Sequence, residues 1–227
     1  MSHAEGSETG RRQLVRLDAV DGAAFARSVW RVAPAIERSM GPEVLANRAG
    51  RRPGDLLPWR PAWAQRCEEI ERQLDEAAFP VVIVADVRRC YPSIGLGALE
   101  RALRHVGARD TDIAPILTWH DWFRDRGVEG LPVGPEPSAV LANAVLAVAD
   151  RALRENGTPF WRWVDDIVAF MPDRRQAIVA LDGLQRALSS AGLELHDGKT
   201  RILFDRDEAR RLLTRRRCSF AAGSDVA

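Results

Sequence analysis

The chain has 227 residues, of which 46% are hydrophobic and 29% are charged, and its net charge is +1 at pH 7. This composition is typical of a globular protein with one sizeable core, and the overall charge favours no polyanionic partner. No apolar run has the length of a membrane span, and the first residues lack the apolar segment of a signal peptide. The three cysteines lack the spacing of zinc sites or disulfide frameworks, so we expect a reduced, cytoplasmic protein without a membrane segment.

The first 80 residues predict a disordered start followed by helices. Residues 1–10 are small and polar, which predicts disorder. Apolar residues at helical spacing predict a helix over 22–39, and a polar helix is expected over 62–76. Residues 49–61 between them are interrupted by Gly and Pro, which predicts a loop.

Arginines gather near both ends of the chain, and such clusters either contact phosphates or form solvated charged faces. They are Arg11, Arg12, Arg16, Arg210, Arg211, Arg215, Arg216 and Arg217.

The pattern changes at residue 81. VVIVAD (81–86) is a short β-branched run that predicts a fully buried strand. Helical periodicity follows over 96–107 and 111–124, and a long alanine-rich helix is expected over 138–157 after a turn-rich loop. The last two helices begin with a threonine and a serine, which are suitable N-caps.

The segment FWRWVDDIVAF (160–170) predicts two strands joined by a tight turn, with Asp165 and Asp166 at its tip. A helix over 173–190 and one or two short strands after it complete the pattern. The order strand, helices, strand, strand, helix, strand is the split β-α-β arrangement. Its first strand lies beside the third, so Asp86 comes close to Asp165 and Asp166. We expect an α+β fold with a ferredoxin-like antiparallel sheet and helices on one face.

Three converging carboxylates need an explanation, because like charges raise one another's pKa and are costly to bury. A polar hairpin turn accounts for Asp165 and Asp166 alone, since aspartate is common in turns. The third carboxylate, Asp86, favours a cation site. Hard oxygen ligands suit Mg²⁺ or Mn²⁺, and two such ions about 3.5–4 Å apart form the clamp used for in-line phosphoryl transfer.

Four segments carry a resemblance to a known family. They are ADVRRCYPSI (85–94), GLPVGPEPSAVLAN (130–143), WRWVDDIVAF (161–170) and LELHDGKTRIL (193–203). In this order and at these intervals they resemble motifs A, B, C and D of reverse transcriptases. The resemblance implies a right-hand polymerase with its palm and catalytic site over 81–205.

The resemblance also implies the remaining domains. Fingers, mainly helical, are expected over 11–80 with 95–130 contributing. RRQLVRLDAVD (11–21) resembles a fingers segment in which Arg12 would contact the triphosphate, although a surface arginine is the competing interpretation. PEVLANR (42–48) resembles a later fingers motif. The thumb is short or absent, and 206–227 is expected to be a basic tail or vestigial thumb.

The resemblance assigns roles at the expected metal site. Asp86 and Asp165 would bind two Mg²⁺ or Mn²⁺ ions, and Asp166 would be a weaker ligand or an electrostatic support. The backbone carbonyl of Val87 would complete one ion's coordination shell. Lys199, the only lysine in the chain, would be the general acid that approaches the leaving pyrophosphate.

Four further residues would contact nucleotide or primer. Tyr91, the only tyrosine, would act as a gate that favours deoxynucleotides, unless it is simply a core aromatic. Gly134 would allow backbone to approach the template or the incoming base. Ser138 either caps its helix or touches the nucleotide. Trp163 replaces the family's usual tyrosine and is expected beneath the primer end.

Motif B has the form Gly-Pro-x-x-Ser, which is similar to bacterial unknown-group and abortive-infection reverse transcriptases. Those relatives often act in phage defence, and some polymerise without a template. Three functions therefore remain open: an RNA-directed DNA polymerase that uses an RNA template, a DNA or RNA primer and dNTPs; a template-independent or protein-primed DNA polymerase; and a non-catalytic nucleic-acid-binding palm in a defence complex. Thumb function is expected to be either missing or supplied by a partner protein, an RNA or a second copy of the chain.

Overall fold

The structure is a computed structural model that describes residues 14–223, with side chains described up to Thr214. Its helices and strands are α1 (Ala19–Ser39), α2 (Trp59–Asp75), β1 (Val81–Asp86), α3 (Cys90–Ser93), α4 (Leu96–His105), α5 (Asp110–Arg124), α6 (Glu136–Glu155), β2 (Phe160–Trp163), β3 (Asp166–Met171), α7 (Arg174–Ser190), β4 (Arg201–Leu203) and α8 (Arg206–Gly223). None of these helices is long and apolar enough to cross a bilayer.

The four strands form one antiparallel sheet in the order β2-β3-β1-β4. Strand β1 is central and pairs with β3 along its whole length, from Val81 opposite Met171 to Asp86 opposite Asp166. This is the predicted split β-α-β arrangement, in which the first strand lies beside the third. Of the one or two short strands expected after the helix over 173–190, β4 is present, and Leu195 forms only an isolated bridge with Val87.

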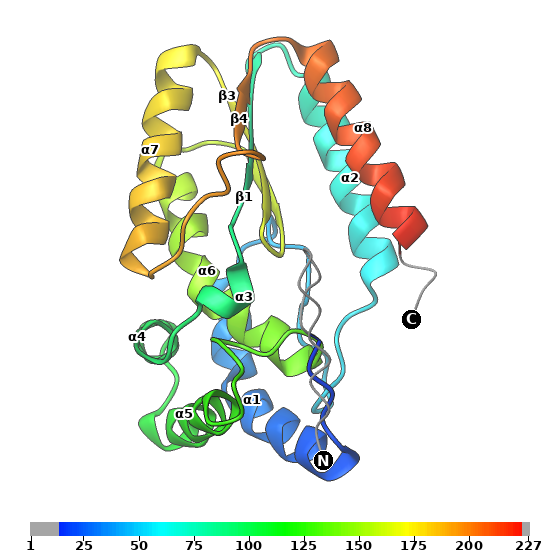
Figure 1. The fold of residues 1–227 in the computed structure, drawn as a ribbon. Helices are drawn as coiled ribbons and strands as arrows, with labels where there is room; N and C mark the ends of the chain where they lie inside the picture. The colour runs from blue at the N-terminus through cyan, green and yellow to red at the C-terminus, as the bar shows by residue number, and fades with distance from the viewer. Residues whose placement is uncertain (1–13, 224–227) are drawn as a thin grey trace.

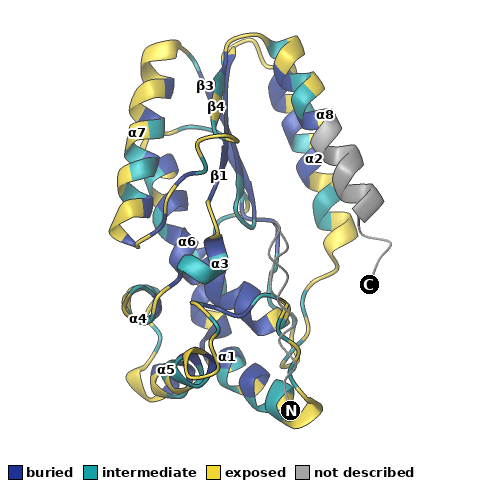
Figure 2. Cartoon of the chain, in the orientation of Figure 1, coloured by how far each residue is buried: buried dark blue, intermediate teal, exposed yellow. Residues whose placement is uncertain are grey.

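Both faces of the sheet are covered, so the expectation of helices on one face was wrong. Helices α6 and α7 lie on one face, and α2 and α8 lie on the other (Figure 1). Ile83 and Ala85 of β1 belong to the hydrophobic cluster that includes residues of α6 and α7. Val82 and Val84 belong to a second cluster, which includes residues of α2 and α8. Every residue of β1 is buried (Figure 2). An uninterrupted apolar strand requires cover on both faces, which is the physical reason for the second helical layer.

Two of the predicted N-cap residues do not lie at the starts of their helices. Asp18 caps α1, where its carboxylate accepts hydrogen bonds from two backbone N–H groups at 3.0 and 2.8 Å. Helix α5 follows Arg109, and α6 follows Pro135, so neither Thr111 nor Ser138 is an N-cap. A proline in the first turn of α6 is compatible with helix and lets it begin before Ser138.

Segment 42–48, which is expected to belong to the fingers, lies against the outer edge of the sheet. The Arg162 N–H of β2 donates to the Glu43 carbonyl at 2.9 Å, and the Leu45 N–H donates to the Arg162 carbonyl at 3.3 Å. Helices α1, α4 and α5 form a further helical layer beside α6 (Figure 1). The segment expected to form fingers is therefore joined by hydrogen bonds to the strand that leads into Asp165.

Candidate active site at the end of the sheet

The three aspartates of motifs A and C lie at the same end of the sheet. Asp86 ends β1 and is the register partner of Asp166, which begins β3. The Val87 N–H donates to the Asp165 carbonyl at 3.1 Å. The backbone thus brings the three residues together, as the topology predicts. Among the side chains of residues 14–214, however, no three from His, Cys, Asp or Glu are grouped closely enough to hold an ion.

The turn between β2 and β3 consists of Val164 and Asp165, so the tip of the hairpin is one residue earlier than expected. Val164 has φ = +54°, in the left-handed region. A β-branched residue rarely adopts this conformation, and such strain persists only where surrounding contacts enforce it. A two-residue hairpin turn requires a positive φ at this position. The geometry of the aspartate pair therefore depends on whatever holds Val164.

Lys199 reaches the most buried of these carboxylates. Its Nζ donates to both oxygens of Asp86, at 3.3 and 3.1 Å. The Asp86 side chain is 9% exposed and that of Lys199 is 47% exposed. The loop that carries the lysine is fixed to the same residue, because the His196 N–H donates to the Asp86 carbonyl at 2.7 Å. Motif D is thus attached to motif A through both backbone and side chain.

This sheet end fits a divalent cation by the chemistry of its donors. Asp86, Asp165 and Asp166 supply carboxylate oxygens, and Val87 supplies a backbone carbonyl, which are the hard ligands that Mg²⁺ and Mn²⁺ prefer. The position beside Asp86 already accepts a positive charge, the Lys199 ammonium group. A cation beside the buried carboxylate is therefore electrostatically favourable.

Tyr91 lies in α3, directly after the motif A strand, and is partly buried against the core. Its carbonyl accepts a hydrogen bond from the Leu131 N–H at 2.9 Å. Gly130 has φ = +60°, and a Cβ there would lie 2.4 Å from the carbonyl oxygens of both Tyr91 and Pro92. Motifs A and B are joined at this contact, which requires glycine at position 130. The sequence analysis did not single out Gly130.

Gly134 and Ser138 have a packing environment that the sequence did not reveal. Gly134 has φ = +124°, and a Cβ there would lie 2.7 Å from the carbonyl oxygen of Val15. The Val15 N–H donates to the Val133 carbonyl at 2.8 Å, so the missing side chain makes room for the segment at 14–15. Ser138 is fully buried, and its hydroxyl has no hydrogen-bond partner in the part of the chain with described side chains. Arg12 lies outside the described residues.

Trp163 is 7% exposed and packs on the second face of the sheet. Its ring is 4.9 Å from that of Trp63 in α2, with an interplanar angle of 75°. Edge-to-face pairs of this kind are favourable beyond the area that they bury. The indole that replaces the family's usual tyrosine therefore extends the contact between the motif C strand and α2.

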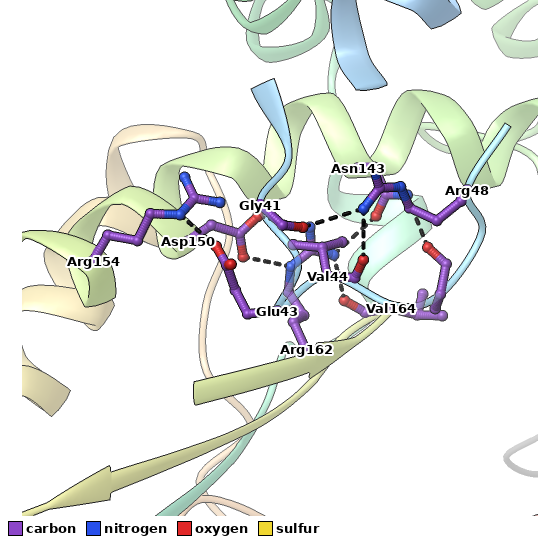
Figure 3. A network of polar contacts seen from close by, with 10 residues as sticks. Gly41, Glu43, Val44, Arg48, Asn143, Asp150, Arg154, Arg162 and Val164 are labelled. Carbon is purple, nitrogen blue, oxygen red and sulfur yellow. Dashed lines mark hydrogen bonds and ion pairs between the residues drawn. The ribbon is translucent and has the colours of Figure 1, made fainter. Parts of the chain in front are cut away.

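A buried polar network behind the hairpin was missed by the sequence analysis. Arg162, which is 0% exposed, donates from Nε and Nη2 to the two oxygens of Asp150 at 2.6 and 2.8 Å. Its Nη1 donates to Asn143 Oδ1 and to the Val164 carbonyl, both at 2.9 Å (Figure 3). Burial lowers the pKa of Arg162, but the Asp150 charge and hydrogen bonds raise it above its usual value, so the guanidinium stays charged.

A signal for this network was present in the sequence. An arginine between two tryptophans in a buried strand needs a partner, because an isolated buried charge is very costly. Asp150, in an otherwise apolar alanine-rich helix, is the complementary charge. Only the packing of α6 against β2 shows that the two residues meet.

These features define a polymerase palm, with catalytic-type carboxylates at the end of a split antiparallel sheet. The family model described as reverse transcriptase (RNA-dependent DNA polymerase) matches residues 42–217. The chain belongs to the reverse transcriptase family.

Solved telomerase structures share this fold. Apo telomerase from Candida tropicalis, truncated from its C-terminal domain, matches with a TM-score of 0.50 at 12% identity, over 79% of this chain and 40% of that one. Telomerase from Candida albicans, in complex with a TWJ fragment of telomeric RNA, matches with a TM-score of 0.54 at 12% identity, over 89% of this chain and 42% of that one. The chain thus spans about two fifths of these structures. No curated protein matches it significantly.

Proposed function

We propose that this chain is an RNA-directed DNA polymerase that adds deoxynucleotides to a primer 3′ end. The observation that carries the proposal is the register of β1 and β3 within a reverse transcriptase domain, which brings Asp86 beside Asp165 and Asp166. Carboxylates on adjacent antiparallel strands suit the binding of two divalent cations. Such ions, when bound, activate the attacking hydroxyl and stabilise the charge that develops on the phosphoryl group.

The chain's own side chains would handle the leaving group and the sugar. Lys199 lies at the edge of the carboxylate cluster and is half-exposed, so its Nζ can reach pyrophosphate and donate a proton to the leaving oxygen. The Tyr91 ring follows the metal-binding strand directly, where it would clash with a ribose 2′-hydroxyl. Both roles rest on the resemblance of motifs A and D.

The proposed partners are an RNA template, a DNA or RNA primer and dNTPs. Helix α8 does not extend away as a thumb: Arg210 pairs with Glu71 and Asp75 of α2 at 2.6 and 2.8 Å. We infer that a protein, an RNA or a second copy of the chain supplies the thumb contacts. The Gly-Pro-x-x-Ser form of motif B, from Gly134 to Ser138, supports a role in phage defence in the cytoplasm.

Motif B also supports a second candidate, a template-independent or protein-primed DNA polymerase, because some bacterial relatives of this form polymerise without a template.

The experiment that separates the two candidates is primer extension on poly(rA)/oligo(dT) with Mg²⁺ or Mn²⁺, comparing wild type with Asp165→Ala plus Asp166→Ala. We expect incorporation that needs the template and is abolished in the variant. Products formed without template would favour the second candidate. A folded wild-type protein that incorporates nothing on any template would overturn the proposal of an RNA-directed DNA polymerase.

A further inference from the structure

The hairpin that carries Asp165 has a strained turn, and the buried side chain of Arg162 donates a hydrogen bond to the backbone of that turn. We propose that Arg162 is a positioning residue, which holds the Val164 carbonyl and thereby sets the placement of Asp165 and Asp166 for catalysis. The proposal rests on the proposed function of these two aspartates. It adds to that function a role for a residue that touches neither nucleotide nor metal.

All three nitrogens of the Arg162 guanidinium donate hydrogen bonds. Two nitrogens form the forked contact with Asp150, whose side chain is 1% exposed. The third nitrogen, Nη1, is shared between Asn143 Oδ1 and the Val164 carbonyl. The contact with Asp150 already neutralises the buried charge. The bond to Val164 is therefore an additional contact, and it reaches the residue with the unfavourable backbone conformation.

A turn with an unfavourable backbone conformation needs a rigid hydrogen-bond donor to hold it in place. Arg162 lies two residues before Val164, and its planar group cannot rotate without breaking the fork with Asp150. Bidentate charge-assisted hydrogen bonds are stronger and more specific in geometry than neutral ones. The Val164 carbonyl is thus fixed relative to helix α6, which also carries Asn143 and Asp150.

The same network joins the hairpin to the fingers segment. The backbone of Arg162 pairs with Glu43 and Leu45, as described for the sheet edge. Asn143 Nδ2 donates to the carbonyls of Ala46 and Asn47, each at 3.2 Å. One side of Asn143 therefore contacts the segment 42–48 and the other side contacts Arg162. A displacement of the fingers segment would be transmitted to the turn at Val164 through these bonds.

A purely structural role is the competing interpretation, in which the pair only attaches α6 to β2. The test removes both charges in the full-length protein, as Arg162→Met with Asp150→Leu. Apolar replacement of a whole buried ion pair is often neutral for stability, whereas removal of one partner is strongly destabilising. We expect this double variant to fold, with a rate constant for nucleotide addition about 100-fold lower and Mn²⁺ binding at least about 10-fold weaker. Mn²⁺ binding is measured by electron paramagnetic resonance.

The matched control is an ion pair away from the hairpin in which only the carboxylate is buried. Asp112 on α5 is 3% exposed and pairs at 2.6 Å with Arg31 of α1, which is 57% exposed. We expect Arg31→Met with Asp112→Leu to leave the rate constant and the Mn²⁺ affinity at the wild-type values. If both pairs reduce them equally, general loosening of the core explains the effect and the proposal is wrong.

A rescue experiment separates positioning from stability. Adding Val164→Gly to the double variant removes the strain that Arg162 is proposed to oppose, because glycine adopts positive φ readily. We expect a recovery of about 10-fold in the rate constant, whereas a structural role predicts none. Should the double variant not fold, Arg162→Lys retains the charge beside Asp150 without the fork, and we expect the same loss of Mn²⁺ affinity. Wild-type values in the folded double variant or in Arg162→Lys would overturn the proposal.

Wild type and Asp165→Ala plus Asp166→Ala are measured in the same series. Mn²⁺ binding that depends on these aspartates, with no incorporation, would contradict the proposed polymerase activity while Arg162 is still judged by its effect on binding. Wild-type protein that binds no Mn²⁺ would overturn both proposals.

Discussion

Two buried carboxylates in this molecule are each held by a cation, and the two pairs are built differently. Asp150 and Arg162 are 1% and 0% exposed, and the arginine uses its planar fork together with two further acceptors. Asp86 is 9% exposed, but its partner Lys199 is 47% exposed and has a single ammonium group. The first pair is enclosed and geometrically fixed. In the second pair, the lysine is half-exposed, so its ammonium group can be hydrated when it leaves the carboxylate.

This difference matches two roles around one hairpin. The enclosed pair, Asp150 with Arg162, contacts the turn, and in our proposal its rigidity maintains the backbone of the aspartates. The open pair is Asp86 with Lys199, and under the proposed function Asp86 would exchange this lysine for a metal ion while the lysine becomes available to the leaving group. A third pair, Asp112 with Arg31 and Arg109, is intermediate, because the carboxylate is buried and both arginines are exposed.

The largest effect is expected when the enclosed pair loses one partner. In Asp150→Ala, Arg162 would remain charged in the core, so we expect the free energy of unfolding to fall by about 3–5 kcal/mol. Urea denaturation measures this change. The control is Asp182→Ala, which breaks an exposed pair with Arg186 and should change the free energy by about 1 kcal/mol or less. Equal effects of the two variants would show that Arg162 is not enclosed.

Removal of the open pair should affect the reaction rather than the fold. We expect Lys199→Met to lower the rate constant for nucleotide addition about 100-fold, because a general acid is lost. The free energy of unfolding should change by about 1 kcal/mol or less, since the lysine is half-exposed. Lys199→Arg should not restore the rate, because a guanidinium does not release its proton at neutral pH. Single-turnover primer extension at saturating Mg²⁺ measures both variants, and a wild-type rate in Lys199→Arg would contradict the role.

The sequence predicted that Asp86 and Lys199 belong to one site, although not that they form an ion pair, and it did not predict that Arg162 meets Asp150. Motifs A, C and D, with the strand order, predict that Asp86, Asp165 and Lys199 meet at one sheet end. The enclosed pair needs knowledge of which turn of α6 faces β2, and periodicity does not give this for a helix that is buried on most sides. The second helical layer was missed for a related reason. Helix α2 is so polar that its sequence does not indicate a buried face.

The intermediate pair should give stability that depends on pH. Burial raises the pKa of Asp112, but hydrogen bonds and charge from Arg109, together with Arg31, outweigh it and hold the pKa below its usual value. A lowered folded-state pKa contributes stability that is present above the unfolded value of about 3.9 and is lost as the pH falls through the folded value. We expect wild type to be more stable than Asp112→Asn at neutral pH, with the difference shrinking below about pH 4. Urea titrations from pH 7 to pH 3 test this, and a constant difference would contradict it.

The smallest effect concerns competition for Asp86. If Lys199 and a metal ion hold the same carboxylate in turn, removal of the ammonium group removes a competitor. We therefore expect Mn²⁺ to bind Lys199→Met up to about 5-fold more tightly than wild type, the range of a partly exposed ion pair. Lys199→Arg, which retains the charge, should bind Mn²⁺ with wild-type affinity. Weaker binding in Lys199→Met would mean that the lysine orients Asp86 for the metal, and the open pair would then resemble the enclosed one in function.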